Sequence, residues 1–392
     1  MMELAQALAE LRRSTRAAVC AECGKCTSVC PLAATGGYHV RSIACQSLEE
    51  ELEGRGVGIR RCLTCGSCDL RCPQGVQFLD LVRGVRELAE PESIEACPHG
   101  GAMQSCMRIM ARNGAEQDRL GWLEPDLRTE PEKGDVFFWA GCAGHLDAFF
   151  PELSAGGPDA NVAAVRVLNR LGVVPVVSAR ERCCGHDLLW NGDRQGFEAL
   201  ARHNVQLLAD SGAHTLVTAC AECLRTWRLD YPPFQGGGAP KVLHLSEYLA
   251  QRLPELEWKE GPPRRVTFQD PCRLGRHAGV YDAPRQVLAA MPGVELVEMP
   301  RSGRRAICCA GGTWTHCDRH TKEIQADRIA EARATGADTL VTACPKCRIH
   351  FACAMRDPDV QEAGGIRMMD LSELVAGSLA RAAAHTGKEA SE

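Results

Sequence analysis

The chain alternates short apolar runs with longer stretches that carry apolar residues at helical spacing. Residues 161–172 follow the helical pattern and end at a glycine, and the run VVPVVS (173–178) after them predicts a strand. Residues 196–212 predict another helix, which also ends at a glycine. Upstream, the polar stretch DLRTEPEKGD (126–135) predicts a linker, and VFFWAGC after it opens with a strand-like run. The alternation of strands and helices predicts mainly parallel sheets.

The second half of this region repeats the first half. The segment HTLVTACAECLRTW (214–227) matches DTLVTACPKCRIHF (338–351), and VLHLSEYLAQRL (242–253) matches MMDLSELVAGSL (368–379). Matching motifs in the same order predict an internal duplication. In both copies the run TLVTAC predicts a buried strand that ends at a cysteine. Because ligands of parallel sheets bind at the C-terminal ends of the strands, we expect a site there.

The pattern divides the chain into three domains. Residues 1–125 are expected to form a helical domain, which begins with the amphipathic segment MMELAQALAELRRSTRAAVC. Residues 136–253 and 264–380 are expected to form two repeated α/β domains, with the linker PELEWKEGPPRR between them. The predicted fold class is therefore a multidomain α+β and α/β protein, which suits a length of 392 residues.

Composition argues against several function classes. The net charge of −5 and the aromatic content of 5% argue against a nucleic-acid partner. No stretch reaches the roughly 20 apolar residues that a membrane span needs. The 23 cysteines are an odd number without a secretory signal, which argues against a disulfide framework. We expect a cytoplasmic protein whose reduced thiols bind metals and whose contact with the inner membrane, if any, runs through a partner.

Two dense cysteine runs near the N-terminus have the spacing C-x2-C-x2-C-x3-C-P. This spacing places three thiolates around one iron–sulfur cubane, and the fourth cysteine, before the proline, reaches the other cluster. Soft thiolates suit 4Fe-4S clusters, and four-thiolate zinc sites are the alternative. The expected ligand sets are Cys20, Cys23, Cys26 with Cys72, and Cys62, Cys65, Cys68 with Cys30. The long gap between the runs contains the helical pattern IACQSLEEELEGRG and resembles the helical ferredoxin of succinate dehydrogenase iron–sulfur subunits.

Each repeat contains a further set of five cysteines, in the order of one cysteine, an adjacent pair, and C-x2-C. The first set is Cys142, Cys183, Cys184, Cys220 and Cys223. The second set is Cys272, Cys308, Cys309, Cys344 and Cys347. On these motifs the chain resembles the heterodisulfide reductase family, whose CCG domains carry the adjacent pair. The N-terminal runs resemble the small ferredoxin subunit of that enzyme, so the chain resembles the form that fuses both subunits.

The resemblance implies that each five-cysteine set holds a noncubane 4Fe-4S cluster. In the family, two such clusters flank a substrate disulfide, and each gives one electron and takes one sulfur. The implied catalytic residues are the adjacent pairs Cys183, Cys184, Cys308 and Cys309. The alternative is that the sets hold ordinary cubane clusters, or that only one holds the special cluster.

Four histidines near the cysteines are candidates for a proton donor to a leaving thiolate. His186, directly after Cys184 and Gly185, is the strongest candidate, and the others are His145, His277 and His316. The alternative for all four is a hydrogen bond to a cluster sulfur or a surface position.

Other residues near the motifs are expected to be structural. The family has a glycine after the adjacent pair, which Gly185 preserves and Ala310 does not, so the shape of the cleft and the choice of substrate are in question. Asp270 in QDPC is expected to be a turn or cap residue. Five cysteines outside the motifs are expected to be small buried residues: Cys45, Cys97, Cys106, Cys317 and Cys353.

The resemblance implies the iron–sulfur subunit of a heterodisulfide-reductase-like complex. Two cubane clusters would pass electrons to two noncubane clusters, which reduce or form a disulfide-type bond. Expected partners are a membrane cytochrome b, a flavoprotein or a hydrogenase, with a disulfide substrate or a sulfur-carrier protein. No nucleotide-binding glycine motif occurs, so the chain is expected to carry no flavin of its own.

Two alternative functions remain open. One is an electron conduit between a membrane cytochrome b or quinone and a soluble hydrogenase or flavoprotein. The other is the iron–sulfur subunit of a glycolate-, lactate- or glycerol-3-phosphate-type dehydrogenase.

Overall fold

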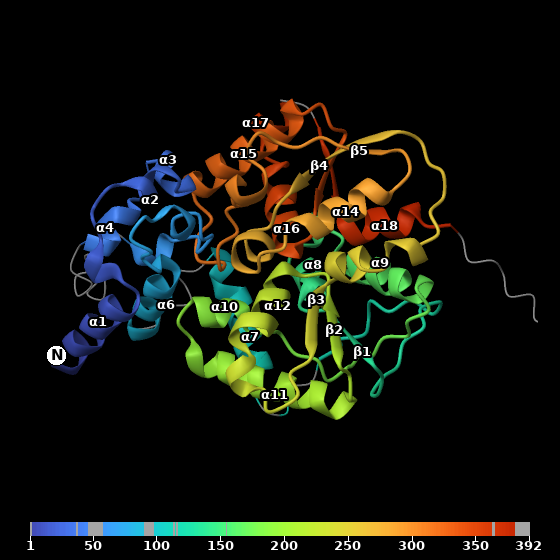
Figure 1. Cartoon of the computed structure of the whole chain (residues 1–392), viewed down its shortest axis with the longest axis horizontal. Helices are drawn as coiled ribbons and strands as arrows, with labels where there is room; N and C mark the ends of the chain where they lie inside the picture. Colours follow the sequence, from blue (N-terminus) through green and yellow to red (C-terminus); the bar gives the residue numbers. More distant parts are fainter. Residues whose placement is uncertain are drawn as a thin grey trace, which may run out of the picture.

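The structure is a computed structural model that describes residues 2–36, 38–45, 58–89, 98–112, 114, 117–153, 155–362 and 365–380. The N-terminal region is helical, as predicted; residues 2–89 lie to one side of the two repeats, whereas the helix at residues 102–110 packs on the first repeat (Figure 1). Its first helix packs closely on α6, where Gly84 leaves room for the Leu11 side chain. The described α-helices of this domain are α1 Met2–Ser14, α2 Lys25–Ser28, α3 Pro31–Ala34, α4 Val40–Cys45, α6 Phe78–Leu88 and α7 Ala102–Met110.

The helical pattern expected over IACQSLEEELEGRG is described only in part. Its first residues belong to α4, and the rest lies outside the described residues. Most cysteines of the two runs lie in loops beside short 3-10 turns such as η2 (Ile59–Arg61) and η3 (Asp69–Arg71), and Cys26 lies in α2.

Strands and helices alternate in both repeats. The first repeat contains β1 Val136–Trp139, α8 Ala143–Phe149, α9 Gly157–Arg170, α10 His186–Trp190, α11 Arg194–Ser211, β2 Thr215–Thr218, α12 Ala221–Arg225, β3 Lys241–His244 and α13 Leu245–Ala250. The second repeat contains β4 Arg264–Gln269, α14 Asp282–Ala290, β5 Val294–Leu296, α15 Arg319–Ala334, β6 Thr339–Thr342, α16 Pro345–Ala354, α17 Pro358–Glu362, β7 Arg367–Asp370 and α18 Leu371–Ser378.

Each repeat builds its own parallel sheet, which confirms the predicted strand arrangement. The strand order is β1-β2-β3 in the first repeat and β5-β4-β6-β7 in the second. All pairs are parallel, and the two TLVT segments form β2 and β6. The predicted helix over 196–212 is α11, and Gly212 ends it in the left-handed conformation. Both sheets lie within the predicted ranges 136–253 and 264–380, although the exact domain boundaries remain a prediction.

The strand predicted for VVPVVS is wrong. Only Val176 in this run forms bridges, one to Glu130 and one to Phe137. It lies at the edge of β1 away from β2, which is the place that β5 takes beside β4 in the second repeat. Pro175 has no N–H to donate, so the run cannot continue a ladder of hydrogen bonds through that position. The bridge at Glu130 also binds part of the predicted linker 126–135 to the first repeat.

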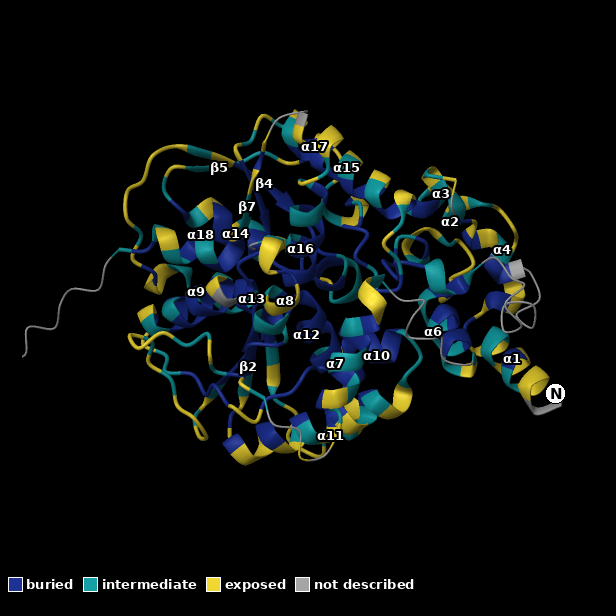
Figure 2. Ribbon diagram, turned by 180° about the vertical axis from the view of Figure 1, so that it is seen from behind, coloured by how far each residue is buried: buried dark blue, intermediate teal, exposed yellow. Residues whose placement is uncertain are grey.

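The two repeats interlock through their last helices. Helix α18 of the second repeat packs on α9 of the first, and α13 of the first packs on α14 of the second. The Ser372 hydroxyl donates a hydrogen bond of 2.8 Å to the Ala160 carbonyl across this contact. Burial is concentrated where the repeats meet, and the outer faces of helices such as α11 are exposed (Figure 2). No helix among the described residues is long and apolar enough to cross a bilayer.

The N-terminal domain contacts the first repeat at Arg86 and Gly192. The buried Arg86 guanidinium donates to the carbonyls of Trp190 and Cys62, at 2.8 Å in both cases. Gly192 has a φ of +91°, and a Cβ there would collide with the backbone carbonyl of Arg86.

We expect Gly192→Ala to destabilise the protein by about 3 kcal/mol or more, because left-handed strain adds to a backbone clash. Gly172→Ala is the matched control: φ is +73° and nothing lies within 4 Å of its added Cβ, so the strain alone should cost about 1 kcal/mol. The midpoints of urea unfolding report both values. Equal losses for the two variants would contradict this account of the contact.

Candidate iron–sulfur sites

The first five-cysteine set gathers at the C-terminal ends of β1 and β2. Cys142 and Cys220 directly precede α8 and α12, and the pair Cys183–Cys184 lies in the loop before α10. Side-chain hydrogen bonds join Cys142 to Cys183, Cys184 to Cys223, and Cys223 to Cys220. Five cysteines spread over 82 positions of sequence (142–223) therefore meet at one place.

The second set repeats this arrangement at the ends of β4 and β6. Sulfur contacts join Cys272 to Cys308, Cys309 to Cys347 at 3.1 Å, and Cys347 to Cys344. All five cysteines line one small cavity, together with Glu222 and Lys346. A cavity lined by five thiols, with no disulfide among the described cysteines, suits an iron–sulfur cluster.

One of the two N-terminal sets is brought together in the same way. Cys62, Cys65, Cys68 and Cys30 line a single cavity, as the spacing predicts. Burial and the neighbouring Cys65 raise the pKa of Cys30 to about 12. In the other predicted set, Cys20 lies near Cys26. Cys23 is exposed and Cys72 is half-buried, and their membership of that set remains a prediction.

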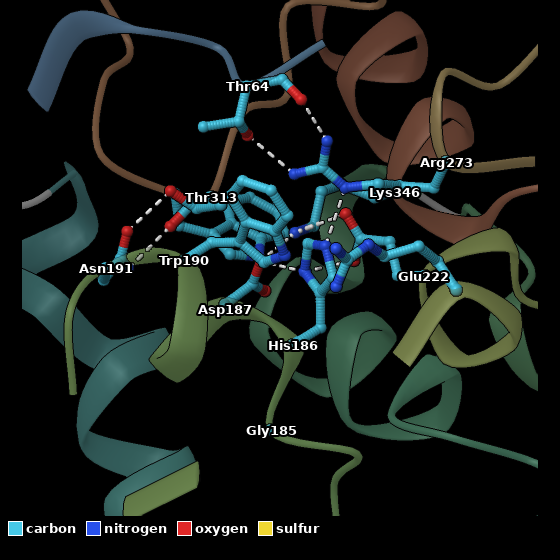
Figure 3. Close-up of polar contacts among 12 residues, drawn as sticks. Thr64, Gly185, His186, Asp187, Trp190, Asn191, Glu222, Arg273, Thr313 and Lys346 are labelled. Carbon is cyan, nitrogen blue, oxygen red and sulfur yellow. Dashed lines mark hydrogen bonds and ion pairs between the residues drawn. The ribbon is translucent and has the colours of Figure 1, made fainter. Parts of the chain in front are cut away.

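A buried polar network connects residues next to the cysteines of the two five-cysteine sets (Figure 3). The Arg273 guanidinium donates to His186 Nε2 at 2.7 Å, so the proton of the neutral ring is on Nδ1, which lies 2.9 Å from Asp187. Burial and the Arg273 charge lower the pKa of His186 well below its usual range. The Lys346 ammonium lies 2.6 Å from Asp187 and 2.9 Å from Glu222. His186, Asp187 and Glu222 lie close enough together to bind a metal ion, but the Lys346 ammonium already provides the positive charge at this place.

Sequence reasoning missed this network, although a signal for it was present. Glu222 and Lys346 occupy the same position in the two C-x2-C motifs, and both motifs lie in buried segments. When the two copies of a duplication pack together, opposite charges at equivalent positions can pair with each other. Burial favours the uncharged form of Asp187, but Lys346 and His186 hold the pKa of that carboxyl below its usual range, so Asp187 and Lys346 form the ion pair.

Comparison with known proteins agrees with this geometry. Residues 16–76 match the 4Fe-4S dicluster domain, and residues 136–228 and 266–352 each match the cysteine-rich domain called CCG. One relative is a subunit of the dihydromethanophenazine:CoB–CoM heterodisulfide reductase of Methanosarcina mazei. The chain is 32% identical to it, over 84% of this chain and 87% of the relative's length.

The chain belongs to the heterodisulfide reductase family.

Other relatives of the chain are oxidoreductases of different kinds. A subunit of the fumarate reductase (CoM/CoB) of Methanothermobacter marburgensis is 28% identical over 91% of this chain and 71% of its own length. The probable iron–sulfur-binding oxidoreductase FadF of Bacillus subtilis is 24% identical over 92% of this chain and 59% of its own length. The chain is thus an iron–sulfur protein of the heterodisulfide-reductase-like and related electron-transfer proteins.

The departure from the family motif at Ala310 preserves the turn. Gly185 and Ala310 both have positive φ values, 75° and 57°, so the backbone follows a left-handed path after each cysteine pair. At Gly185 a Cβ would lie 3.0 Å from the Phe197 ring, which explains a glycine in the first copy. At Ala310 the left-handed backbone costs roughly 1–2 kcal/mol of strain instead.

The other residues singled out from the sequence have protein partners or lie outside the cysteine sets. Burial and Arg119 lower the pKa of His145 to about 4, and burial lowers the pKa of His316. Asp270 pairs with Arg285 and accepts a hydrogen bond from the Gly303 N–H, consistent with a structural role. Of the five other cysteines, Cys317 is exposed rather than buried, Cys106 and Cys353 are half-buried, and the side chains of Cys45 and Cys97 lie outside the described residues.

Proposed function

We propose that this chain is the iron–sulfur subunit of a heterodisulfide-reductase-like complex that reduces or forms a disulfide-type bond. The observation that carries the proposal is the completeness of both five-cysteine sets, each of which converges at the ends of parallel strands. A chain that only relayed electrons would not need two copies of the paired-cysteine site. The membrane cytochrome b, flavoprotein or hydrogenase partner belongs to the same proposal.

The proposed ligands follow the cysteine sets. Cys20, Cys23, Cys26 and Cys72 would hold one cubane cluster, and Cys62, Cys65, Cys68 and Cys30 the other. The two five-cysteine sets would hold noncubane clusters, with the pairs Cys183–Cys184 and Cys308–Cys309 nearest the reacting sulfurs. Bound clusters would supply electrons one at a time, and reduction of one disulfide to two thiols consumes two electrons and two protons.

The chain's own residues organise this chemistry in a dry site. Both adjacent pairs are buried, so water is kept from the sulfurs. His186 bonds Arg273 and Asp187 through its two ring nitrogens, which favours a positioning role over the proton-donor role considered from the sequence.

The electron-conduit function is the second candidate, and the buried network favours it. Asp187 and Glu222 pair with Lys346, and Glu222 and Lys346 line the cavity of the second set, so charged side chains occupy buried space beside those cysteines. Turnover of the anaerobically prepared protein with reduced viologen and small disulfides tests the choice. Absence of turnover, together with ready electron transfer between two partner proteins, would establish the conduit.

Iron analysis provides an independent prediction. With all four sites filled, we expect about sixteen iron atoms per chain. A content of about eight would leave the repeats without clusters and would contradict the proposal for the two five-cysteine sets.

A further inference from the structure

The two repeats differ at the segment that follows their first cysteine. In the second repeat, Cys272 is followed by the π-helical turn η10 (Arg273–His277). Aligned on Cys142 and Cys272, the copies carry different residues: Ala143, Leu146 and Asp147 in the first copy, and Arg273, Arg276 and His277 in the second. The basic cluster is therefore present in only one of the two copies.

All three basic residues of η10 bind the loop between Cys62 and Gly66 of the N-terminal domain. The Arg273 guanidinium donates to the Thr64 hydroxyl at 2.6 Å, and also to the Thr64 carbonyl (Figure 3). The Arg276 guanidinium donates to the Cys65 carbonyl at 2.6 Å and to the Ala306 carbonyl at 2.6 Å. His277 Nε2 lies 3.0 Å from the Thr64 carbonyl. These contacts join the Cys62–Cys65 loop directly to the second five-cysteine set.

The junction also brings two sulfur atoms into contact. A side-chain hydrogen bond joins Cys65 of the N-terminal domain to Cys308 of the second set. The half-buried Arg276 charge faces both of these cysteines and Cys272. Electron transfer slows steeply with distance, so a direct sulfur contact offers the shortest route between two sites.

The first set has a different basic neighbour, which lies before the first repeat in the sequence. Its nearby arginine, Arg119, donates to the Gly141 carbonyl at 2.6 Å and pairs with Glu181 at 2.7 Å. Cys220 of the first set lies near Cys344 of the second set.

We propose that electrons enter the repeats through the second five-cysteine set, and that Arg273 and Arg276 are the positioning residues that hold this junction. The inference rests on one part of the proposed function, namely that clusters occupy the cysteine sets. Each step would be a one-electron transfer: a cluster held by Cys62, Cys65, Cys68 and Cys30 would lose one electron as a cluster held by the second set gains one. No bond forms or breaks, and the first set receives its electron from the second.

Rapid-freeze EPR on the full chain tests the order of reduction. The oxidised protein is mixed with a photoreduced two-cluster ferredoxin, a donor too large to reach the buried cysteine pairs. In Cys184→Ser the second set should be reduced at the wild-type rate, whereas in Cys309→Ser reduction of the first set should slow by about a hundredfold or be lost. Wild-type reduction of the first set in Cys309→Ser would overturn the proposed order.

A redox titration followed by EPR tests the positioning residues. Arg276→Gln removes a positive charge beside the junction, so the midpoint potentials of the second set and of the Cys62 site should become more negative. Arg276→Lys should restore most of the potential, while transfer stays about tenfold slow because lysine cannot bridge both carbonyls. Arg119→Lys, beside the first set, is the matched control and should leave the Cys62 site unchanged.

Unchanged potentials and rates in both Arg276 variants would overturn the role of this residue. Because neither experiment uses a disulfide, failure of disulfide turnover would refute the proposed function and leave the electron route standing.

Discussion

Replacing Cys309 by Ser should abolish disulfide reduction by the intact protein, while the clusters near the N-terminus remain reducible. Cys309 is buried and contacts both Cys308 and Cys347, so it lies at the centre of the second set. The serine hydroxyl is a hard and poorly acidic ligand, and it cannot replace a thiolate on iron. We expect the loss of turnover to exceed the roughly hundredfold effect of changing a residue outside the ligand shell.

Viologen oxidation with a small disulfide measures the loss, and EPR of the reduced protein reports the N-terminal clusters. Cys184→Ser should behave in the same way, because the proposed reaction uses both sets. Cys353→Ser is the matched control: this sulfur accepts a hydrogen bond from Lys322 at 3.1 Å and belongs to neither set, so turnover should persist. Full activity in Cys309→Ser would remove the catalytic role of the second set.

Lys346→Met should destabilise the repeats by about 3–5 kcal/mol, the cost of breaking a buried ion pair from one side. The substitution leaves the Asp187 and Glu222 carboxyls without their cation in a site where all three side chains are largely buried. Although burial opposes it, the charges of Asp187 and Glu222 raise the pKa of Lys346, so the wild-type ammonium is charged. The double variant Lys346→Met/Asp187→Asn should recover part of the loss, since it removes the stranded charge.

Urea unfolding followed by tryptophan fluorescence measures these changes, because Trp190 and Trp314 are buried beside the network. Lys322→Met is the control: Lys322 pairs with Asp357 at 3.5 Å near the surface, and its loss should cost about 1 kcal/mol or less. A loss for Lys346→Met as small as that of Lys322→Met would show that the network contributes little to stability.

Much of the local structure could be predicted because its determinants are close together in the sequence. Gly212 ends α11 where the helical pattern predicts, since a glycine adopts a left-handed conformation at little cost. The TLVT runs form buried parallel strands, and each is followed by a cysteine at the expected end. The run VVPVVS is apolar but does not form a strand, because Pro175 has no N–H to donate to a ladder of hydrogen bonds.

Spacing, order and duplication in the sequence predict which thiols belong together. The sulfur contacts within each five-cysteine set are compatible with that grouping, and a further contact joins Cys65 to Cys308 across two sets. Which charged residues surround them was decided only by the tertiary structure. Thr64 and Arg273 are separated by 209 positions, and Asp187 and Lys346 by 159. These pairs meet because α18 packs on α9 and the N-terminal domain docks on η10, and no local pattern encodes the angle at which such surfaces pack. The sequence thus predicts the thiol sets from spacing and duplication, whereas packing between domains sets the charges and contacts around those thiols.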